Sequence, residues 1–238
     1  MTPVLGARRE RARAATIDEI KQTALALMRE QQTTDVRFTD IAREMGMTPP
    51  ALYRYFADRD ELLTALIADA YDELGRAMAE ALAPIPERDV AARWLAAAQA
   101  YRHWARQEPQ QFALILGLPV PGYVAPQDGP TTEASQRAMA QLSGLFVSAL
   151  EHGKLHKPLL REVDDVIEVC ALGKNEDLGC EIPAANFQAM LHAWASLHGF
   201  TSLEAYGHLD WMEPEARDAL FVAQVRLAAK VSGLPTTA

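Results

Sequence analysis

The segment FTDIAREMGMTPPALYRYF, residues 38–56, constrains the fold of this chain more than any other stretch. Its first half carries apolar residues at i, i+3, i+4 and i+7, the spacing of one helix face: Phe38, Ile41, Ala42 and Met45. Thr39 can cap the start of this helix, and Gly46 offers the backbone freedom that ends one. We therefore expect a short helix that stops at a turn.

A second short helix should follow that turn. Thr48 can cap it, and Pro49 suits its first position, where a missing N–H costs nothing. Leu52 and Phe56 fall on one face of this helix. The opposite face carries Pro50, Tyr53 and Arg54. The arrangement predicts a helix-turn-helix, in which the second helix enters the major groove of DNA.

Residues 16–64 resemble the DNA-binding domain of the TetR family of bacterial transcriptional regulators. The resemblance rests on an amphipathic helix (TIDEIKQTALALMREQ), then FTDIAREMGM, then ALYRYF, then DRDELL opening a long helix. It implies an all-α fold, with a three-helix helix-turn-helix DNA-binding head and a helical body for ligand binding and dimerisation. We place the N-terminal arm and DNA-binding domain at residues 1–62, and the body at residues 63–238.

The family pattern also implies which residues bind DNA: Thr39, Thr48, Pro49, Pro50, Tyr53, Arg54, Tyr55 and Arg59. The tyrosines would bond phosphate oxygens, and Arg54 would read guanine through a bidentate fork. Many members have a Lys-Gly-like pair where this chain has Pro49-Pro50, which shifts the expected contacts to Thr48 and Arg54. The alternative is a helix-turn-helix that serves only packing.

The net charge of −9 is unevenly distributed. Residues 1–56 hold nine Lys/Arg and seven Asp/Glu, or +2, so the remaining fourteen and twenty-five give −11. A local basic surface is enough for phosphate contacts. Four arginines opposed only by Glu10 form a basic arm before the first helix: Arg8, Arg9, Arg11 and Arg13. We expect this arm to be disordered alone and to lie along DNA, or in its minor groove, when DNA is bound.

Helical periodicity continues through the rest of the chain, and no segment alternates as a strand would. We expect helices at about 17–31, 60–82, 132–152, 183–206 and 213–232, a helix capped by Asp89, another from Pro109, and a shorter one within 159–172. Residues 117–130 and 175–183 should be loops. The last two helices are the expected dimer interface, the alternative being that both are wholly internal.

Trp194-Ala-Ser-Leu-His198-Gly199 resembles the Trp–His–Gly signature of one class of TetR C-terminal domain, as does QQFALILGLPVPGY. An inducible regulator needs a pocket, which would be mostly apolar with a few polar groups. The ligand-binding candidates are Tyr101, Trp104, Phe112, Phe146, Trp194 and His198, with His103 and His192 as further polar candidates. For any one of these residues an ordinary place in the core is the favoured interpretation, whereas a pocket somewhere in the body is expected.

Several other functions find no support in the sequence. No His/Asp/Glu set has metal-ligand spacing, no catalytic constellation is recognisable, and no cofactor is expected. Cys170 and Cys180 are expected to be core and loop thiols rather than a disulfide. No apolar run reaches the roughly 18–20 residues that span a bilayer, and the N-terminus lacks the apolar segment of a signal peptide. We therefore expect a cytoplasmic location.

Taken together, these features indicate a homodimeric one-component transcriptional regulator. We expect it to be a repressor rather than an activator. Its partners would be a palindromic operator in double-stranded DNA, a second copy of itself, and an unidentified small-molecule effector. Two alternatives stay open: an all-α ligand-binding enzyme that keeps a helix-turn-helix head, and a sequestering protein.

Overall fold

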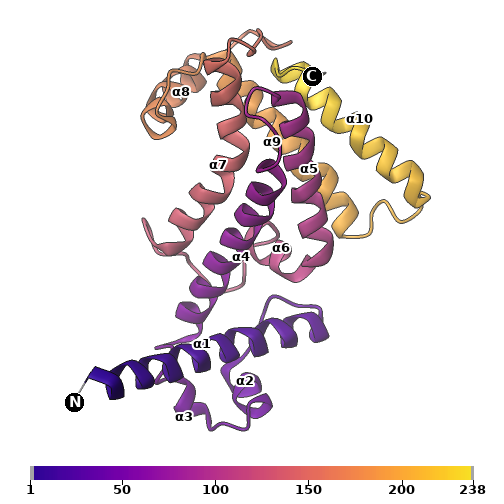
Figure 1. Ribbon diagram of the computed structural model, residues 1–238. Helices are drawn as coiled ribbons and strands as arrows, with labels where there is room; N and C mark the ends of the chain where they lie inside the picture. Colours follow the sequence, from indigo (N-terminus) through magenta and orange to yellow (C-terminus); the bar gives the residue numbers. More distant parts are fainter. Residues whose placement is uncertain (1–2, 237–238) are drawn as a thin grey trace. The chain divides into compact units, whose positions relative to one another are not determined.

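The computed structural model describes residues 3–236, and within that range every regular element is a helix. Figure 1 shows their arrangement along the chain. The helices are α1 (Pro3–Gln31), α2 (Phe38–Glu44), α3 (Pro49–Leu52), α4 (Arg59–Leu82), α5 (Val90–Gln107), α6 (Pro109–Leu116), α7 (Pro130–Glu151), α8 (Asp165–Leu178), α9 (Ala184–Ala205) and α10 (Pro214–Ser232). The prediction of an all-α fold is confirmed.

The chain packs into two compact units. The first contains the residues up to Asp72 together with Glu108–Ser135, and the second contains Glu73–Gln107 together with the residues from Gln136 on. Helix α4 therefore contributes to both. These units are defined by packing, whereas the predicted division at residue 62 concerns function and stays a prediction.

The first unit is built around the apolar faces of its helices. α1 buries Ile20, Ala24, Leu27 and Met28, as its periodicity predicts. They join one core with Ile41 of α2, Leu52 of α3 and the first turns of α4. Burying each large side chain stabilises the unit by roughly 1.5–3 kcal/mol. Leu114 of α6 and Val120 enter the same core, so this unit is larger than the three-helix head.

The second unit is centred on α9, which packs against α5, α8 and α10. The indole Nε1 of Trp94 on α5 donates to the carbonyl of Val225 on α10 at 2.9 Å, and its ring meets Phe146 of α7 edge-on. The cap predicted for α5 is present, because the amide of Ala92 donates to Oδ1 of Asp89 at 3.1 Å.

Four sequence predictions need correction. The arm expected to be disordered is helical, because α1 begins at Pro3; its run of Ala, Arg and Glu favours helix. Thr39 lies inside α2, and the N-cap is Arg37. α8 runs through Asn175–Leu178, which were expected to be loop. Cys170 is exposed on α8 rather than in a core, and both cysteines are free thiols.

Candidate nucleic-acid interface and effector cavity

The turn between α2 and α3 sets the direction of the recognition segment. Gly46 adopts φ +64, a left-handed conformation that glycine reaches without steric cost. The amide of Met47 donates back to the carbonyl of Ala42 at 2.8 Å, which closes the end of α2. Thr48 is the N-cap of α3 without a side-chain hydrogen bond, and Pro49 takes the first helical position, as predicted.

α3 presents two chemically different faces. Leu52 and Phe56 are buried in the core, while Thr48, Pro49, Pro50 and Arg54 are exposed. The Tyr53 side chain is 56% exposed, and its ring lies 5.2 Å from that of Phe38, centroid to centroid. The predicted orientation of this face is therefore confirmed. The helix itself is shorter than expected, because it ends at Leu52 and continues as a turn.

Arg13 ties α1 to the recognition segment, a contact that the sequence did not reveal. Its Nη1 donates to the carbonyl of Arg54 at 2.8 Å, and its guanidinium lies over the Tyr55 ring at 5.3 Å from the centroid. Tyr55 is half-buried against the core. The backbone that carries Arg54 is thus held from a helix about forty residues away.

Thr39 and Arg59, the two predicted DNA-binding residues that lie outside the recognition segment, differ in accessibility. Thr39 is exposed on the first turn of α2. Arg59 is half-buried and already bonded within the unit: Nε donates to the carbonyl of Val36 at 3.2 Å, and Nη2 meets Oδ1 of Asp35 at 2.6 Å. Arg59 would therefore have to exchange an internal partner for a phosphate.

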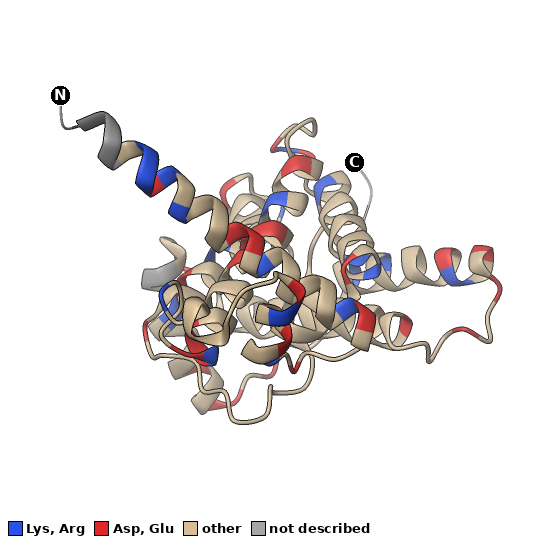
Figure 2. Cartoon of the chain, turned by 90° about the horizontal axis from the view of Figure 1, so that it is seen from below, with Lys and Arg blue, Asp and Glu red and all other residues tan. Residues whose placement is uncertain are grey.

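Further cations surround this region. Figure 2 shows basic residues grouped on the first turns of α1, where Arg8, Arg9 and Arg11 are exposed. Arg37 and Arg43 are also exposed, at the two ends of α2, although Arg43 lies 3.1 Å from Asp40. Neither was predicted as a site residue, because the predicted set was carried over from the family pattern and that set did not include these two positions.

Two aromatic residues of the second unit, Tyr101 and Trp194, contact His198. Its Nδ1 lies 3.0 Å from the Tyr101 hydroxyl, and its ring stacks on Trp194 at 5.7 Å. Burial lowers the pKa of His198 from its ordinary value of 6.5, so the imidazole is neutral near pH 7. Neutral His198 can hold this contact as either donor or acceptor.

One apolar cavity of about 240 Å³ lies between α5, α7 and α9. Its lining consists of Trp94, Met139, Leu142, Ser143, Phe146, Met190, Leu191 and Trp194. Trp194 Nε1 is buried and has no hydrogen-bond partner among the described residues. The cavity therefore combines apolar walls with a buried N–H donor on one of its lining side chains, which favours a small ligand with an acceptor atom.

The six ligand-binding candidates do not converge on this cavity. Phe146 and Trp194 line it, and Tyr101 and His198 connect to it through Trp194. Trp104 is buried in the second unit outside the lining. Phe112 is fully buried in the first unit. Trp94 and the residues of α7 were missed as lining candidates, because helical spacing alone does not distinguish a cavity wall from a filled core.

Among the described side chains, residues 7–175 and 178–236, no group of three or more His, Cys, Asp or Glu could hold a metal ion. None of the helices in that part of the chain is long and apolar enough to cross a lipid bilayer.

An all-helical chain with an exposed helix-turn-helix defines a class of DNA-binding regulators, and comparison with known proteins specifies the family. Residues 20–66 match the family model described as bacterial regulatory proteins, tetR family. Residues 94–228 match the tetracyclin repressor-like C-terminal domain. The chain belongs to the TetR family of transcriptional regulators.

Individual relatives agree with that assignment. The HTH-type transcriptional regulator Rv1816 of Mycobacterium tuberculosis is 34% identical over 199 residues, covering 80% of this chain and 81% of that protein. The crystal structure of the regulatory protein SCO4313 matches with a TM-score of 0.72 and 31% identity, covering 92% of this chain and 97% of that one. RolR, crystallised with resorcinol, has the same fold with a TM-score of 0.50, 18% identity and coverage of 96% and 100%.

Proposed function

We propose that the protein is a cytoplasmic transcriptional repressor that binds a near-palindromic operator as a homodimer and is released by a small molecule. The observation that carries the proposal is the outward face of α3, where Tyr53 and Arg54 are exposed on a helix anchored by buried Leu52. Two such heads would dock in successive major grooves, roughly 34–36 Å apart.

The proposed DNA contacts follow the accessibility of each residue. Arg54, Tyr53, Thr48, Thr39 and the two prolines are exposed and meet DNA without rearrangement. Tyr55 and Arg59 are half-buried, and their main role is to hold the DNA by its phosphate backbone rather than to read its bases. The basic turns of α1 add phosphate contacts, which carry affinity rather than sequence preference.

The proposed effector is a small single-ring compound that enters the cavity lined by Phe146 and Trp194. A volume of about 240 Å³ suits a ligand of that size, and Trp194 Nε1 offers one hydrogen bond to it. RolR, which shares the fold, was crystallised with resorcinol, a compound of comparable size. The repressor would release DNA because the ligand binds better to the conformation that fits DNA poorly.

Replacing Arg54 by Ala tests the DNA interface. We expect operator affinity to fall by about 1–3 kcal/mol and the preference at one base pair to relax, because the fork to guanine is lost. The operator is first selected from random duplexes with the native protein, and affinity is measured by gel shift at several salt concentrations. Arg88→Ala, at an exposed arginine of the second unit, is the matched control.

Two results would contradict this assignment. Unchanged sequence preference in Arg54→Ala would remove Arg54 from base recognition. An affinity for duplex DNA that does not fall with salt would favour the alternatives, an enzyme or a sequestering protein with a helix-turn-helix head, because phosphate binding releases counterions.

A further inference from the structure

Helix α8 exposes an apolar surface that nothing within the described chain covers. Val166, Val169 and Leu172 are 74%, 70% and 66% exposed. Leu159 and Leu160, just before the helix, are exposed as well, and among the α8 side chains that the structure describes Ala171 alone is buried. Clustered exposed apolar side chains usually mark an interface.

The neighbouring helices have outward faces of related character. In the 22 residues of α9 the only Asp, Glu, Lys or Arg is Glu204, and it is buried. A helix with so few charges is normally covered all round. Leu191 and Leu203 of α9, and Leu220 and Leu227 of α10, are nevertheless exposed.

The charges on the exposed faces of α8, α9 and α10 indicate what kind of surface could cover them. Each chain carries a net charge of −9, so two copies repel each other unless they meet through uncharged or complementary faces. The outward face of α9 is uncharged. α8 bears Asp165 and Glu168 beside its valines, and α10 bears exposed Arg226 and Lys230 beside Leu227; no ion pair joins any of these four to another described residue.

Symmetry then specifies the pairing. α8 and α10 both pack against α9, and Figure 1 shows them on either side of it. If the two-fold axis runs beside α9 and parallel to it, it exchanges the two sides, so α8 of one copy faces α10 of the other. An axis lying across α9 would instead place α8 on α8, with acids facing acids, which disfavours that arrangement. We infer that α8 packs against α10 of a second copy of this chain. The valines of α8 contact Leu220 and Leu227, and its two acids, Asp165 and Glu168, lie beside Arg226 and Lys230.

This inference rests on the proposed homodimer through the last two helices and adds α8 to that interface. Disulfide trapping tests it, because Cys170 lies exposed on α8 between Val169 and Ala171. In a Cys180→Ser background Cys170 is the sole native thiol, and a second cysteine is placed at Leu220, Ala223 or Leu227. A disulfide requires Cα atoms within about 7 Å, so the three positions sample the register.

We expect at least one of these variants to form a covalent dimer on mild oxidation, detected by non-reducing electrophoresis. Gln107→Cys, exposed at the end of α5, is the matched control and should not link to Cys170. Ala195→Cys combined with Cys170→Ser and Cys180→Ser, on the outward face of α9, should link to itself if α9 lies beside the axis.

A second measurement avoids dependence on the disulfide. Val169→Glu should weaken the dimer at least about tenfold in sedimentation equilibrium, since a charge would enter an apolar contact. Circular dichroism checks that the helices are retained. Leu118→Glu, at an exposed leucine of the first unit, should leave dimerisation unchanged.

The outcomes separate this inference from the proposed function. A dimer that links through Ala195→Cys, but neither traps Cys170 nor responds to Val169→Glu, would overturn the α8 contact alone and assign its surface to another partner. A protein that remains monomeric at all concentrations would overturn both.

Discussion

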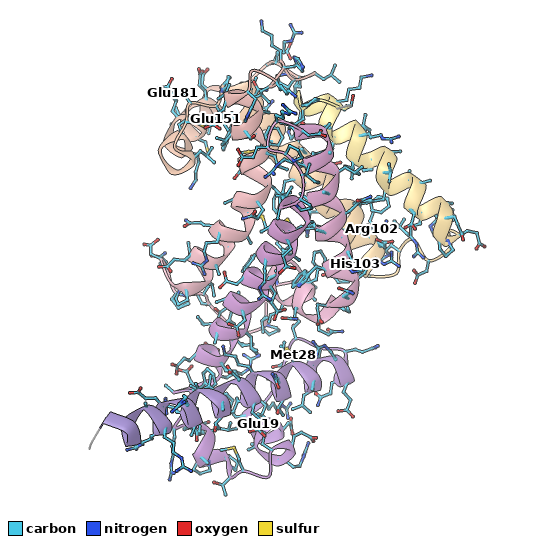
Figure 3. All side chains as sticks on the ribbon, viewed as in Figure 1. Glu19, Met28, Arg102, His103, Glu151 and Glu181 are labelled. Atoms are coloured by element: carbon cyan, nitrogen blue, oxygen red, sulfur yellow. The ribbon has the colours of Figure 1, made fainter. Side chains whose placement is uncertain are left out.

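At the scale of single residues, Arg102 shows how a charge is buried in this fold. Its guanidinium makes two contacts of 2.5 Å with Glu204 and one of 2.7 Å with Asp218, and it lies 4.6 Å from the Phe221 ring centroid. Burial alone would lower the pKa of Arg102, but the hydrogen bonds and the negative charges of Glu204 and Asp218 together outweigh it and raise the pKa. Figure 3 marks Arg102 on α5.

Replacing Glu204 by Gln should therefore destabilise the protein by about 3–5 kcal/mol, because it removes the buried countercharge of the guanidinium and leaves only that of exposed Asp218. Urea unfolding followed by circular dichroism measures the change. Asp218→Asn is the matched control and should cost less than about 1 kcal/mol, since the Asp218 side chain is 61% exposed. Equal losses in the two variants would show that burial does not distinguish them.

At the scale of elements, the helix-turn-helix depends on the turn as much as on its helices. α3 is a single helical turn, and so short a helix is not stable by propensity alone. Its direction is set by Gly46, by the packing of Leu52 and Phe56, and by Arg13 at the carbonyl of Arg54. The head should therefore respond strongly to the conformation of Gly46.

We expect Gly46→Ala to lower stability by about 1–2 kcal/mol, the cost of a left-handed conformation for an L-residue. A Cβ at Gly46 would meet open space, so the loss would come from the backbone alone. Gly144→Ala, in the exposed interior of α7, should instead stabilise by about 0.5–1 kcal/mol. Thermal unfolding of both variants gives the comparison, and two changes of the same sign would refute this account.

At the scale of the whole molecule, the proposed function couples two sites in different compact units. Arg54 belongs to the first unit, and the cavity lined by Phe146 and Trp194 belongs to the second. Linkage requires that a ligand which weakens DNA binding is itself bound more weakly by the DNA complex, by the same factor.

Single-ring phenols, including resorcinol, should weaken operator binding of the native protein by about 5–150-fold if one of them fits the cavity. Trp194→Phe should bind operator normally but lose most of this response, since it removes the indole N–H donor while keeping an aromatic ring. Calorimetry with and without operator measures the reciprocal effect. A variant that responds like the native protein would exclude Trp194 from the effector site.

The sequence by itself determined the elements and the family. Apolar periodicity, Gly46 and Pro49 act over a few residues, so the helix-turn-helix, the faces of α3 and most helix bounds could be read directly from the chain. The same local patterns could not show which aromatic residues share a cavity. Phe112 and Phe146 have similar spacing and composition around them, yet packing places them in different units.

Only the tertiary structure decided the contacts between distant residues. Arg13 at the carbonyl of Arg54, Arg102 at Glu204, and the exposed valines of α8 all depend on how helices far apart in sequence pack. Local propensity depends on how a residue interacts with its neighbours in the sequence. Burial and electrostatics depend instead on surroundings that exist once the chain has folded.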